Sequence, residues 1–178
     1  MKTDIIKHLL DLPTKHFVGI DNGVTGSVGI ITIHGAVQSS AFFSTPVIKC
    51  PSYTKKIQYI HRIDYDKLMA SLPVGNVICL MERPMINSSA FTATLSAARA
   101  LEATIIALEM LNIPFDYIDS KEWQSEFISS AVMGHDAMKE ASKQIGLKLF
   151  PNNAGYINKH GDADGLLIAE YARRQHSK

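Results

Sequence analysis

Apolar runs along the chain predict three closely spaced strands, followed by alternating helices and strands. Residues 28–33 and 36–43 flank the pair His34-Gly35, which favours a tight hairpin turn. The run over residues 77–81 lacks alternation, which is typical of a central strand buried on both faces. The expected strands are residues 17–20, 28–33, 36–43, 77–81 and 115–118.

Helical spacing of apolar residues predicts the remaining elements. The longest helix is expected over about residues 89–111, where apolar residues recur every three or four positions and alanine is abundant. Trp123 and Phe127 are expected on the core face of a short helix, and Gly146 is expected to cap another helix at its C-terminus. The shorter expected helices are residues 4–11, 64–71, 121–128, 136–145 and 162–174, with loops over 44–62 and between the last two helices.

This order of elements predicts an α/β fold. Three consecutive strands joined by short turns pair in antiparallel fashion, and alternating helices and strands then add parallel strands. We therefore expect a mixed five-stranded sheet flanked by helices. The 178 residues, of which 46% are hydrophobic and 20% charged, suit one soluble domain. We assign residues 1–15 to an N-terminal extension with a short helix, and residues 16–178 to the folded domain.

Composition argues against several classes of protein. The longest apolar-rich stretch, residues 100–113, contains Glu102 and Glu109, so no membrane span is expected. The N-terminus is too charged for a secretory signal. Cys50 and Cys79 lack metal-binding spacing, which favours free thiols in a reducing compartment. A cytoplasmic location is therefore expected.

Two carboxylates follow predicted strands at positions where they would meet. Asp21 ends the first strand in the stretch GIDNGVTGSVGI, and Glu82 follows residues 77–81 directly. If these strands are parallel neighbours, both carboxylates face the crevice at the carboxyl ends of the strands, where open α/β sheets bind ligands. Taken alone, Asp21 also suits a glycine-rich turn, so the remaining carboxylates decide between the two interpretations.

Further carboxylates occur in HGDADGLLIAE, at the start of the last helix. Asp164 shares a helical face with Leu167 and Ile168, so it would lie against the sheet, where a carboxylate is costly unless it is paired or bound to metal. Asp162 is either an N-cap, which the helix dipole favours, or a second metal ligand. His160 is either an auxiliary residue, as a metal ligand or a holder of water, or a surface histidine.

The chemistry of these side chains points to a hard cation. Oxygen ligands without cysteine or histidine spacing favour Mg²⁺, with Mn²⁺ as a substitute. Three or four carboxylates around one crevice suit two metal ions about 3.5–4 Å apart, which serve phosphodiester hydrolysis. No organic cofactor is expected.

The formal net charge is only +1, so any binding of nucleic acid must come from local groups of basic residues. Lys139 and Lys143 share a helical face, Lys121 follows the strand over residues 115–118, and Arg83 follows Glu82. Each of these is equally consistent with solvated surface charge. The candidate DNA-binding residues are Arg83, Lys121, Lys55, Lys56, Lys139 and Lys143.

Over about residues 16–175 the chain resembles the RuvC-type Holliday junction resolvases, especially their shorter phage forms, which have a ribonuclease H-like fold. GIDNGVTGS is similar to the family's GIDPG-x-x-TG element, ICLMERP to its strand ending in glutamate, and ADGLLIAEYARR to its terminal helix. The resemblance implies that Asp21, Glu82 and Asp164 bind metal. D-x-G turns also occur in actin-like phosphate loops. The set of Asp21, Glu82 and Asp164, in this order on matching elements, is therefore more specific than any one motif.

Two positions depart from the family pattern. Asn22 stands where the family usually has proline, which alters the stiffness of the turn but no chemistry. Gly161 stands where the family's other C-terminal ligand usually lies, three residues before Asp164. Asp162 or His160 must then substitute, and we favour Asp162.

The resemblance implies a homodimer that cuts four-way DNA junctions with paired nicks. A nuclease of the same fold that cuts flaps or other branched DNA is the first alternative. An actin-like kinase would need a duplicated domain, for which 178 residues are too few. A non-catalytic DNA-binding module has no reason to keep Asp21, Glu82 and Asp164 together.

Overall fold

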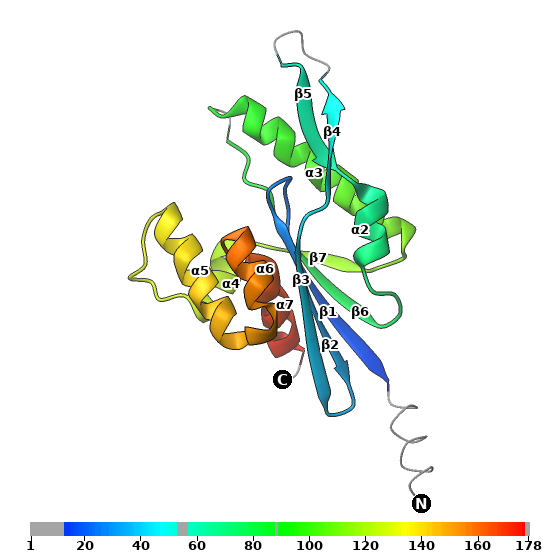
Figure 1. Cartoon of the computed structure of the whole chain (residues 1–178), viewed down its shortest axis with the longest axis vertical. Helices are drawn as coiled ribbons and strands as arrows, with labels where there is room; N and C mark the ends of the chain where they lie inside the picture. Colours follow the sequence, from blue (N-terminus) through cyan, green and yellow to red (C-terminus); the bar gives the residue numbers. More distant parts are fainter. Residues whose placement is uncertain (1–12, 53–56, 88, 177–178) are drawn as a thin grey trace, which may run out of the picture.

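A five-stranded sheet forms the centre of the protein (Figure 1). The computed structural model describes residues 13–52, 57–87 and 89–176. Strand order is β3-β2-β1-β6-β7; β1, β2 and β3 are antiparallel, and β6 and β7 join in parallel. The strands are β1 (Thr14–Asp21), β2 (Ser27–His34), β3 (Val37–Ser44), β6 (Val77–Glu82) and β7 (Phe115–Ile118). The predicted mixed sheet is confirmed.

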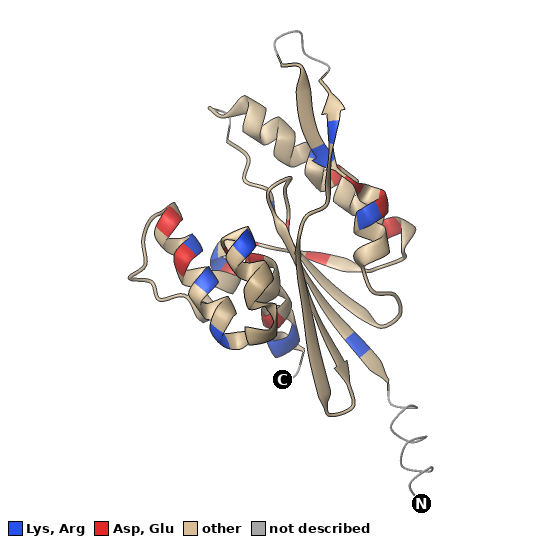
Figure 2. Cartoon of the chain, in the orientation of Figure 1, with Lys and Arg blue, Asp and Glu red and all other residues tan. Residues whose placement is uncertain are grey.

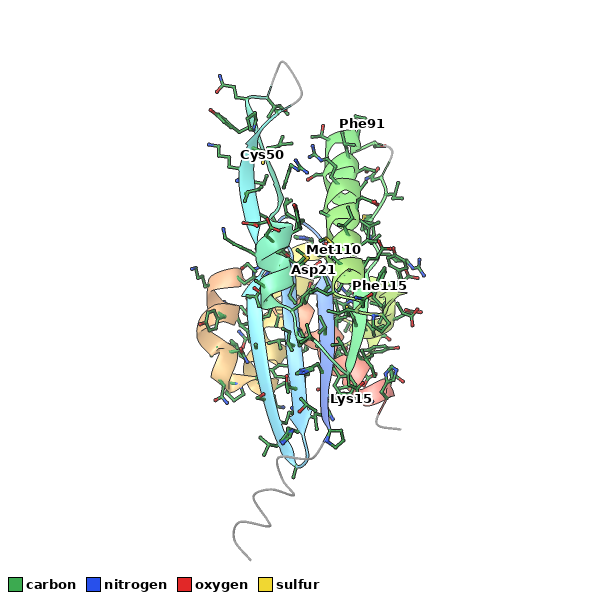
Figure 3. All side chains as sticks on the ribbon, turned by 90° about the vertical axis from the view of Figure 1, so that its right-hand side faces the viewer. Lys15, Asp21, Cys50, Phe91, Met110 and Phe115 are labelled. Atoms are coloured by element: carbon green, nitrogen blue, oxygen red, sulfur yellow. The ribbon has the colours of Figure 1, made fainter. Side chains whose placement is uncertain are left out.

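Helices cover both faces of this sheet. Figure 3 looks onto the side that carries α2 and α3, which pack on Val18, Ile20 and Val28. The opposite face, with Phe17 and Ile31, is covered by α7 together with α4 and α6. The helical elements are α2 (Tyr65–Ser71), α3 (Phe91–Met110), α4 (Ser120–Phe127), α5 (His135–Leu149), the 3₁₀ turn η1 (Pro151–Asn153), α6 (Ala154–His160) and α7 (Asp164–Gln175).

The helix α7 lies directly on the backbone of β1 and β2. A Cβ atom added at Gly19 would come 2.3 Å from the backbone nitrogen of Ala169, and one added at Gly29 would come 2.4 Å from Cα of Leu166. On the helix side, a Cβ at Gly165 would lie 2.8 Å from the backbone nitrogen of Gly29. Glycine at these positions therefore permits a backbone-to-backbone approach that no other residue allows.

The segment 44–62, expected as a loop, contains a two-stranded hairpin instead. Its strands are β4 (Val47–Pro51) and β5 (Tyr59–Ile63), which pair only with each other among the described residues. Pro46 lies before β4 and Pro51 at its last position, so neither proline interrupts the ladder. The two prolines therefore lie at the two ends of a strand and do not indicate a loop.

Two expectations for the segment between residues 146 and 162 are also wrong. Gly146 does not end α5, which continues to Leu149; a Cβ at Gly146 would come 2.2 Å from Cβ of Ala163. This glycine therefore allows α5 to pack against the segment before α7. The expected loop after it holds η1 and α6, whose Ile157 is fully buried.

The expected N-terminal helix over residues 4–11 lies outside the described residues. Thr14 and Lys15, assigned from the sequence to the N-terminal extension, already belong to β1. The sheet thus begins slightly earlier than the hydrophobic run over residues 17–20 indicates.

The helix α3 is long and apolar enough to cross a membrane by length and composition, with a mean hydropathy of 1.3. It packs on the sheet instead, through the buried residues Ala100, Thr104, Ala107 and Leu108. Only 22% of its most apolar window is buried, so much of its surface is exposed. The exposed side of α3 carries apolar side chains, such as Phe91 and Met110, together with the charged residues Glu102 and Glu109.

The glycine contacts predict a large loss of stability on substitution. In Gly19→Ala the added Cβ meets backbone atoms that cannot move without shifting α7, so we expect the free energy of unfolding to fall by about 3 kcal/mol. Gly155→Ala in α6 is the matched control because its Cβ would meet nothing within 4 Å. Urea denaturation measures both; equal stabilities of the two variants would contradict the close approach of α7 to β1.

Candidate metal centre

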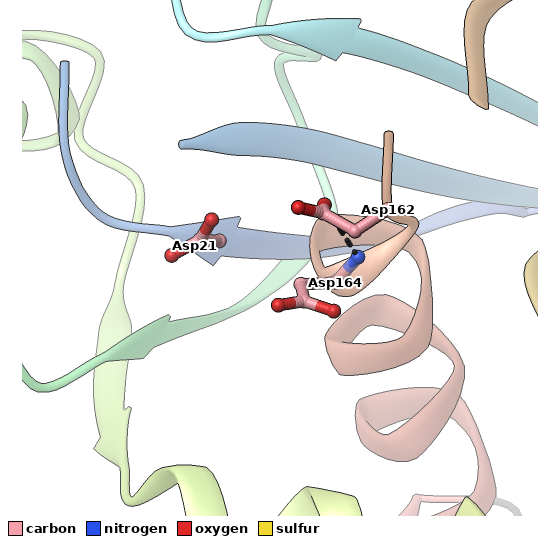
Figure 4. Close-up of side chains that lie close together, drawn as sticks. All are labelled: Asp21, Asp162 and Asp164. Atoms are coloured by element: carbon pink, nitrogen blue, oxygen red, sulfur yellow. Dashed lines mark hydrogen bonds between the residues drawn. The ribbon is translucent and has the colours of Figure 1, made fainter. Parts of the chain in front are cut away.

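Three aspartates converge where β1 ends and α7 begins. Asp21 is the last residue of β1, Asp164 is the first residue of α7, and Asp162 lies two residues before it. One carboxylate oxygen of each lies within 4.8 Å of the others. Figure 4 shows the three side chains pointing toward a common space, with the backbone N–H of Asp164 donating to Oδ1 of Asp162 over 3.4 Å.

Local turns hold these residues in place. The chain folds back tightly after Asp21: the N–H of Gly26 donates to the carbonyl of Gly23 over 3.2 Å, and a Cβ at Gly26 would come 2.0 Å from the carbonyl oxygen of Asp21. This turn returns the chain into β2 at Ser27, whose buried hydroxyl accepts from the N–H of Gly165 over 3.1 Å. The start of β2 thus fixes the start of α7 beside Asp21.

The site concentrates negative charge in a buried place. Burial raises the pKa of Asp21 well above its usual value, and the charges of Asp164, Glu82 and Asp162 raise it further, against a smaller effect of Lys139. Burial and then the charge of Asp162 raise the pKa of Asp164 to about 7, although the hydroxyl of Ser142 donates to its carboxylate.

The donor set fits a hard divalent cation. No described residue donates a hydrogen bond to the carboxylate of Asp21, although this residue is half-buried and its carboxylate faces two others. Buried like charges are stable together only when they take up protons or bind a cation. Carboxylate oxygens are the ligands that Mg²⁺ and Mn²⁺ prefer. Asp21, Asp162 and Asp164 are therefore the residues that could hold such an ion.

Asp162 has its own polar partners in His160 and Lys139. Nε2 of His160 lies 3.3 Å from its Oδ1, and Nζ of Lys139 lies 3.4 Å from its Oδ2. Burial alone would raise the pKa of Asp162, but the hydrogen bond and charge of His160 and the charge of Lys139 outweigh burial and lower it. The His160 side chain is 8% exposed, and its Nδ1 bonds the hydroxyl of Ser44 over 2.8 Å, so it is not a surface histidine.

Glu82 lies beside the aspartates but outside the group whose oxygens come within 4.8 Å. It ends β6, one position beyond the parallel pair Ile20–Met81, as expected for a neighbour of Asp21. Both of its carboxylate oxygens accept from α4: Oε1 from Ser120 Oγ over 2.5 Å and Oε2 from Trp123 Nε1 over 2.8 Å.

Sequence patterns did not identify Ser120, Trp123 or Ser142 as partners of the carboxylates. Trp123 was expected in the core, and it is fully buried, but its indole N–H points to Glu82. A signal existed: Ser120 and Trp123 share a helical face directly after a strand whose end neighbours Glu82. For Ser142, on α5, no comparable signal exists.

The predicted DNA-binding residues lie at different distances from this centre. Lys139 contacts it directly through Asp162, and Lys143 follows one turn later on α5 (Figure 2). Lys121 is exposed in the first turn of α4, the helix that contacts Glu82. Lys55 and Lys56 lie outside the described residues.

Arg83 borders a cavity of about 280 Å³ next to the acidic residues. Its Nε lies 3.1 Å from Oδ1 of Asp119, and its guanidinium lies 5.0 Å from the centre of the Tyr117 ring. Asn22 and Glu82 also line this cavity, opposite residues of α3. The side-chain oxygen Oδ1 of Asn22 accepts from the hydroxyl of Thr104 over 3.1 Å, so Asn22 connects the turn after Asp21 to α3.

Comparison with known proteins shows the fold. No protein-family model and no curated protein matches the chain. The RuvC of Thermus thermophilus in complex with a Holliday junction substrate has a TM-score of 0.52 and 17% identity, over 90% of this chain and 96% of that chain. A second T. thermophilus RuvC structure has a TM-score of 0.48 and 15% identity, over 90% and 96%. The chain thus has the fold of the first structure, as the motifs predicted.

Without a bound cation, the raised pKa values predict a stability that falls with rising pH. The folded protein keeps protons that Asp164, with a usual pKa of 3.8, releases on unfolding, so this stabilisation is complete at low pH and disappears as pH rises through about 7. Asp164→Asn imitates the protonated state. In EDTA, we expect the free energy of unfolding of the variant, relative to that of the wild type, to rise by at least about 1 kcal/mol from pH 6 to pH 8.

Urea denaturation at the two pH values measures this difference. The lowered pKa of His16 acts in the opposite direction, with stability rising as pH rises through its titration, but it affects both proteins equally and cancels. A variant whose advantage is the same at both pH values would contradict the raised pKa of Asp164.

Proposed function

We propose that this protein is a metal-dependent endonuclease that resolves four-way DNA junctions by paired phosphodiester hydrolysis. The observation that carries the proposal is the convergence of Asp21, Asp162 and Asp164 within 4.8 Å at the carboxyl end of β1. The fold supports it, because the RuvC with the same fold was solved with a Holliday junction substrate. The activity would serve the cytoplasm of a bacterial or phage-infected cell.

In this proposal, Asp21, Asp162, Asp164 and Glu82 hold Mg²⁺, in two sites, with Mn²⁺ able to substitute. When bound, such ions activate a water molecule and stabilise the charge on the leaving oxygen. His160 and Lys139 keep Asp162 ionised and in place, since both lie within 3.4 Å of its carboxylate. Ser142, which is 1% exposed, fixes the orientation of Asp164 through its hydroxyl.

Basic residues around the centre would bind the DNA backbone. With a net charge of +1, affinity must come from a few local phosphate contacts rather than from the whole surface. Lys139, on α5, contacts Asp162, and Arg83 directly follows Glu82 at the end of β6. We propose phosphate contacts for Arg83, Lys121, Lys139, Lys143, Lys55 and Lys56.

We also propose a homodimer, because paired nicks in two strands need two active sites. The uncovered side of α3 supports this: Phe91 is 72% exposed, Met110 61% and Ile106 41%. A cavity of about 740 Å³ lies between this helix and the hairpin β4–β5. Ile106 and Met110 lie one turn apart at the C-terminal end of α3, and exposed apolar patches are typical of protein interfaces.

A nuclease that cuts flaps or other branched DNA is the second candidate. One observation favours it: all three aspartates come from a single chain, so cutting one strand needs no second copy. The two candidates differ in whether cleavage depends on a pair of active sites.

The test incubates the protein with a four-way junction, a flap and a linear duplex, in Mg²⁺ or in EDTA. We expect paired, symmetric nicks in the junction, only with Mg²⁺. Asp21→Asn should slow cleavage on the order of 1,000-fold, because it removes a ligand of ions that contribute several kcal/mol. Asp116→Asn, an exposed aspartate on β7, is the control and should keep full activity. Equal cutting of flaps would favour the second candidate, and full activity of Asp21→Asn would exclude the metal centre.

Salt dependence tests the proposed phosphate contact of Lys121. Removing one lysine that binds a phosphate should reduce the slope of log affinity against log salt by about 1. We therefore expect the slope to be lower by this amount for Lys121→Ala. The slope is measured for binding to a four-way junction in Ca²⁺, with the junction left uncleaved. Lys15→Ala is the control, since Lys15 lies at the far end of β1 from Asp21 (Figure 3). Identical slopes for the two variants would exclude binding of phosphate by Lys121.

A further inference from the structure

Glu82 is held by two donors from one short helix. Ser120 Oγ donates to Oε1 over 2.5 Å, and Trp123 Nε1 donates to Oε2 over 2.8 Å. Trp123 is fully buried, and its indole is among the largest buried side chains of the protein. Each carboxylate oxygen therefore has one donor, which fixes both the position and the plane of the carboxylate.

The fold accounts for this arrangement. Glu82 pairs with Ile118 in the parallel ladder between β6 and β7, and α4 begins two residues after Ile118. A capping box of Asp119 and Glu122 fixes the first turn of this helix. Ser120 and Trp123, three residues apart, then face the end of β6 together.

Packing alone does not explain why the indole N–H of Trp123 donates to the carboxylate of Glu82. A buried indole N–H needs a hydrogen-bond partner, but any backbone carbonyl would serve. Here the partner is a carboxylate whose charge raises the pKa of both Asp21 and Asp164. A carboxylate offers about four lone-pair positions, so two remain open for a cation after both donors have bound.

We propose that Ser120 and Trp123 are positioning residues that orient Glu82 toward the divalent cation. This inference rests on the proposed function, because it takes Glu82 as a ligand of that cation. Removing a hydrogen-bond partner of a metal ligand weakens metal affinity by about 10-fold to 100-fold. The chain contains a single tryptophan, so the indole N–H of Trp123 also reports directly on the state of Glu82.

The first measurement follows the indole N–H by NMR in ¹⁵N-labelled full-length protein. One indole signal is expected, since Trp123 is the only tryptophan. Titration with Mg²⁺ should shift this signal with the same midpoint as metal binding. In Glu82→Ala the signal should lie elsewhere before any metal is added and should no longer respond. An indole signal that ignores both the metal and Glu82→Ala would overturn the proposal.

The second measurement is the affinity for Mn²⁺ by calorimetry, without DNA. We expect about 10-fold weaker binding for Trp123→Phe, which keeps an aromatic ring but loses the N–H, and for Ser120→Ala. In a Glu82→Ala background, Trp123→Phe should cause no further loss, because its effect acts through Glu82. Ile128→Val is the matched control: this residue is the C-cap that follows α4 and is buried, but does not bond Glu82.

The outcomes separate this inference from the proposed function. If Ser120→Ala and Trp123→Phe bind Mn²⁺ as the wild type does, while Asp21→Asn binds more weakly, the positioning role is wrong and the metal centre stands. An equal loss from Trp123→Phe with and without Glu82 would mean a purely structural role. If Asp21→Asn leaves Mn²⁺ binding unchanged, the metal centre itself is wrong. Should Trp123→Phe not fold, Ser120→Ala and the wild-type NMR titration still decide.

Discussion

The close approach of α7 to the backbone of β1 and β2 determines where the acidic residues lie. Gly19 and Gly29 on the strands and Gly165 on the helix let the backbones of the two layers meet at these positions. The first turn of α7 therefore lies against the end of β1, and Asp162 and Asp164 come within reach of Asp21. The same packing buries these carboxylates, which is the main cause of the raised pKa of Asp21 and Asp164.

Hydrogen-bond donors are distributed unequally among the four carboxylates. Asp162 has His160 and Lys139, Asp164 has the hydroxyl of Ser142, and Glu82 has two donors from α4. Asp21 has none among the described residues. A site organised in this way holds three carboxylates in fixed orientations and leaves the fourth to be satisfied by a proton or a cation. This asymmetry is the physical basis for proposing that the centre holds a metal ion.

Much of the fold follows from patterns of period two and 3.6, and the antiparallel pairing of the first three strands followed from their short connections. The carboxylates Asp21 and Glu82 were located because strand ends can be predicted from apolar runs. Contacts between distant elements leave no such pattern: the hydroxyl of Ser142 and the burial of His160 depend on how α5 and α6 pack. Gly146 and the hairpin β4–β5 were misjudged because glycine and proline were interpreted as ends of elements, whereas here they allow close packing or mark the limits of a strand.

Anomalous diffraction from crystals grown with Mn²⁺ tests the central claim most directly, because it locates the ion without relying on activity. We predict an anomalous peak among the carboxylates of Asp21, Asp162 and Asp164, with Glu82 at its border. No peak among these residues at saturating Mn²⁺, or a peak confined to another part of the surface, would contradict the assignment of a metal centre.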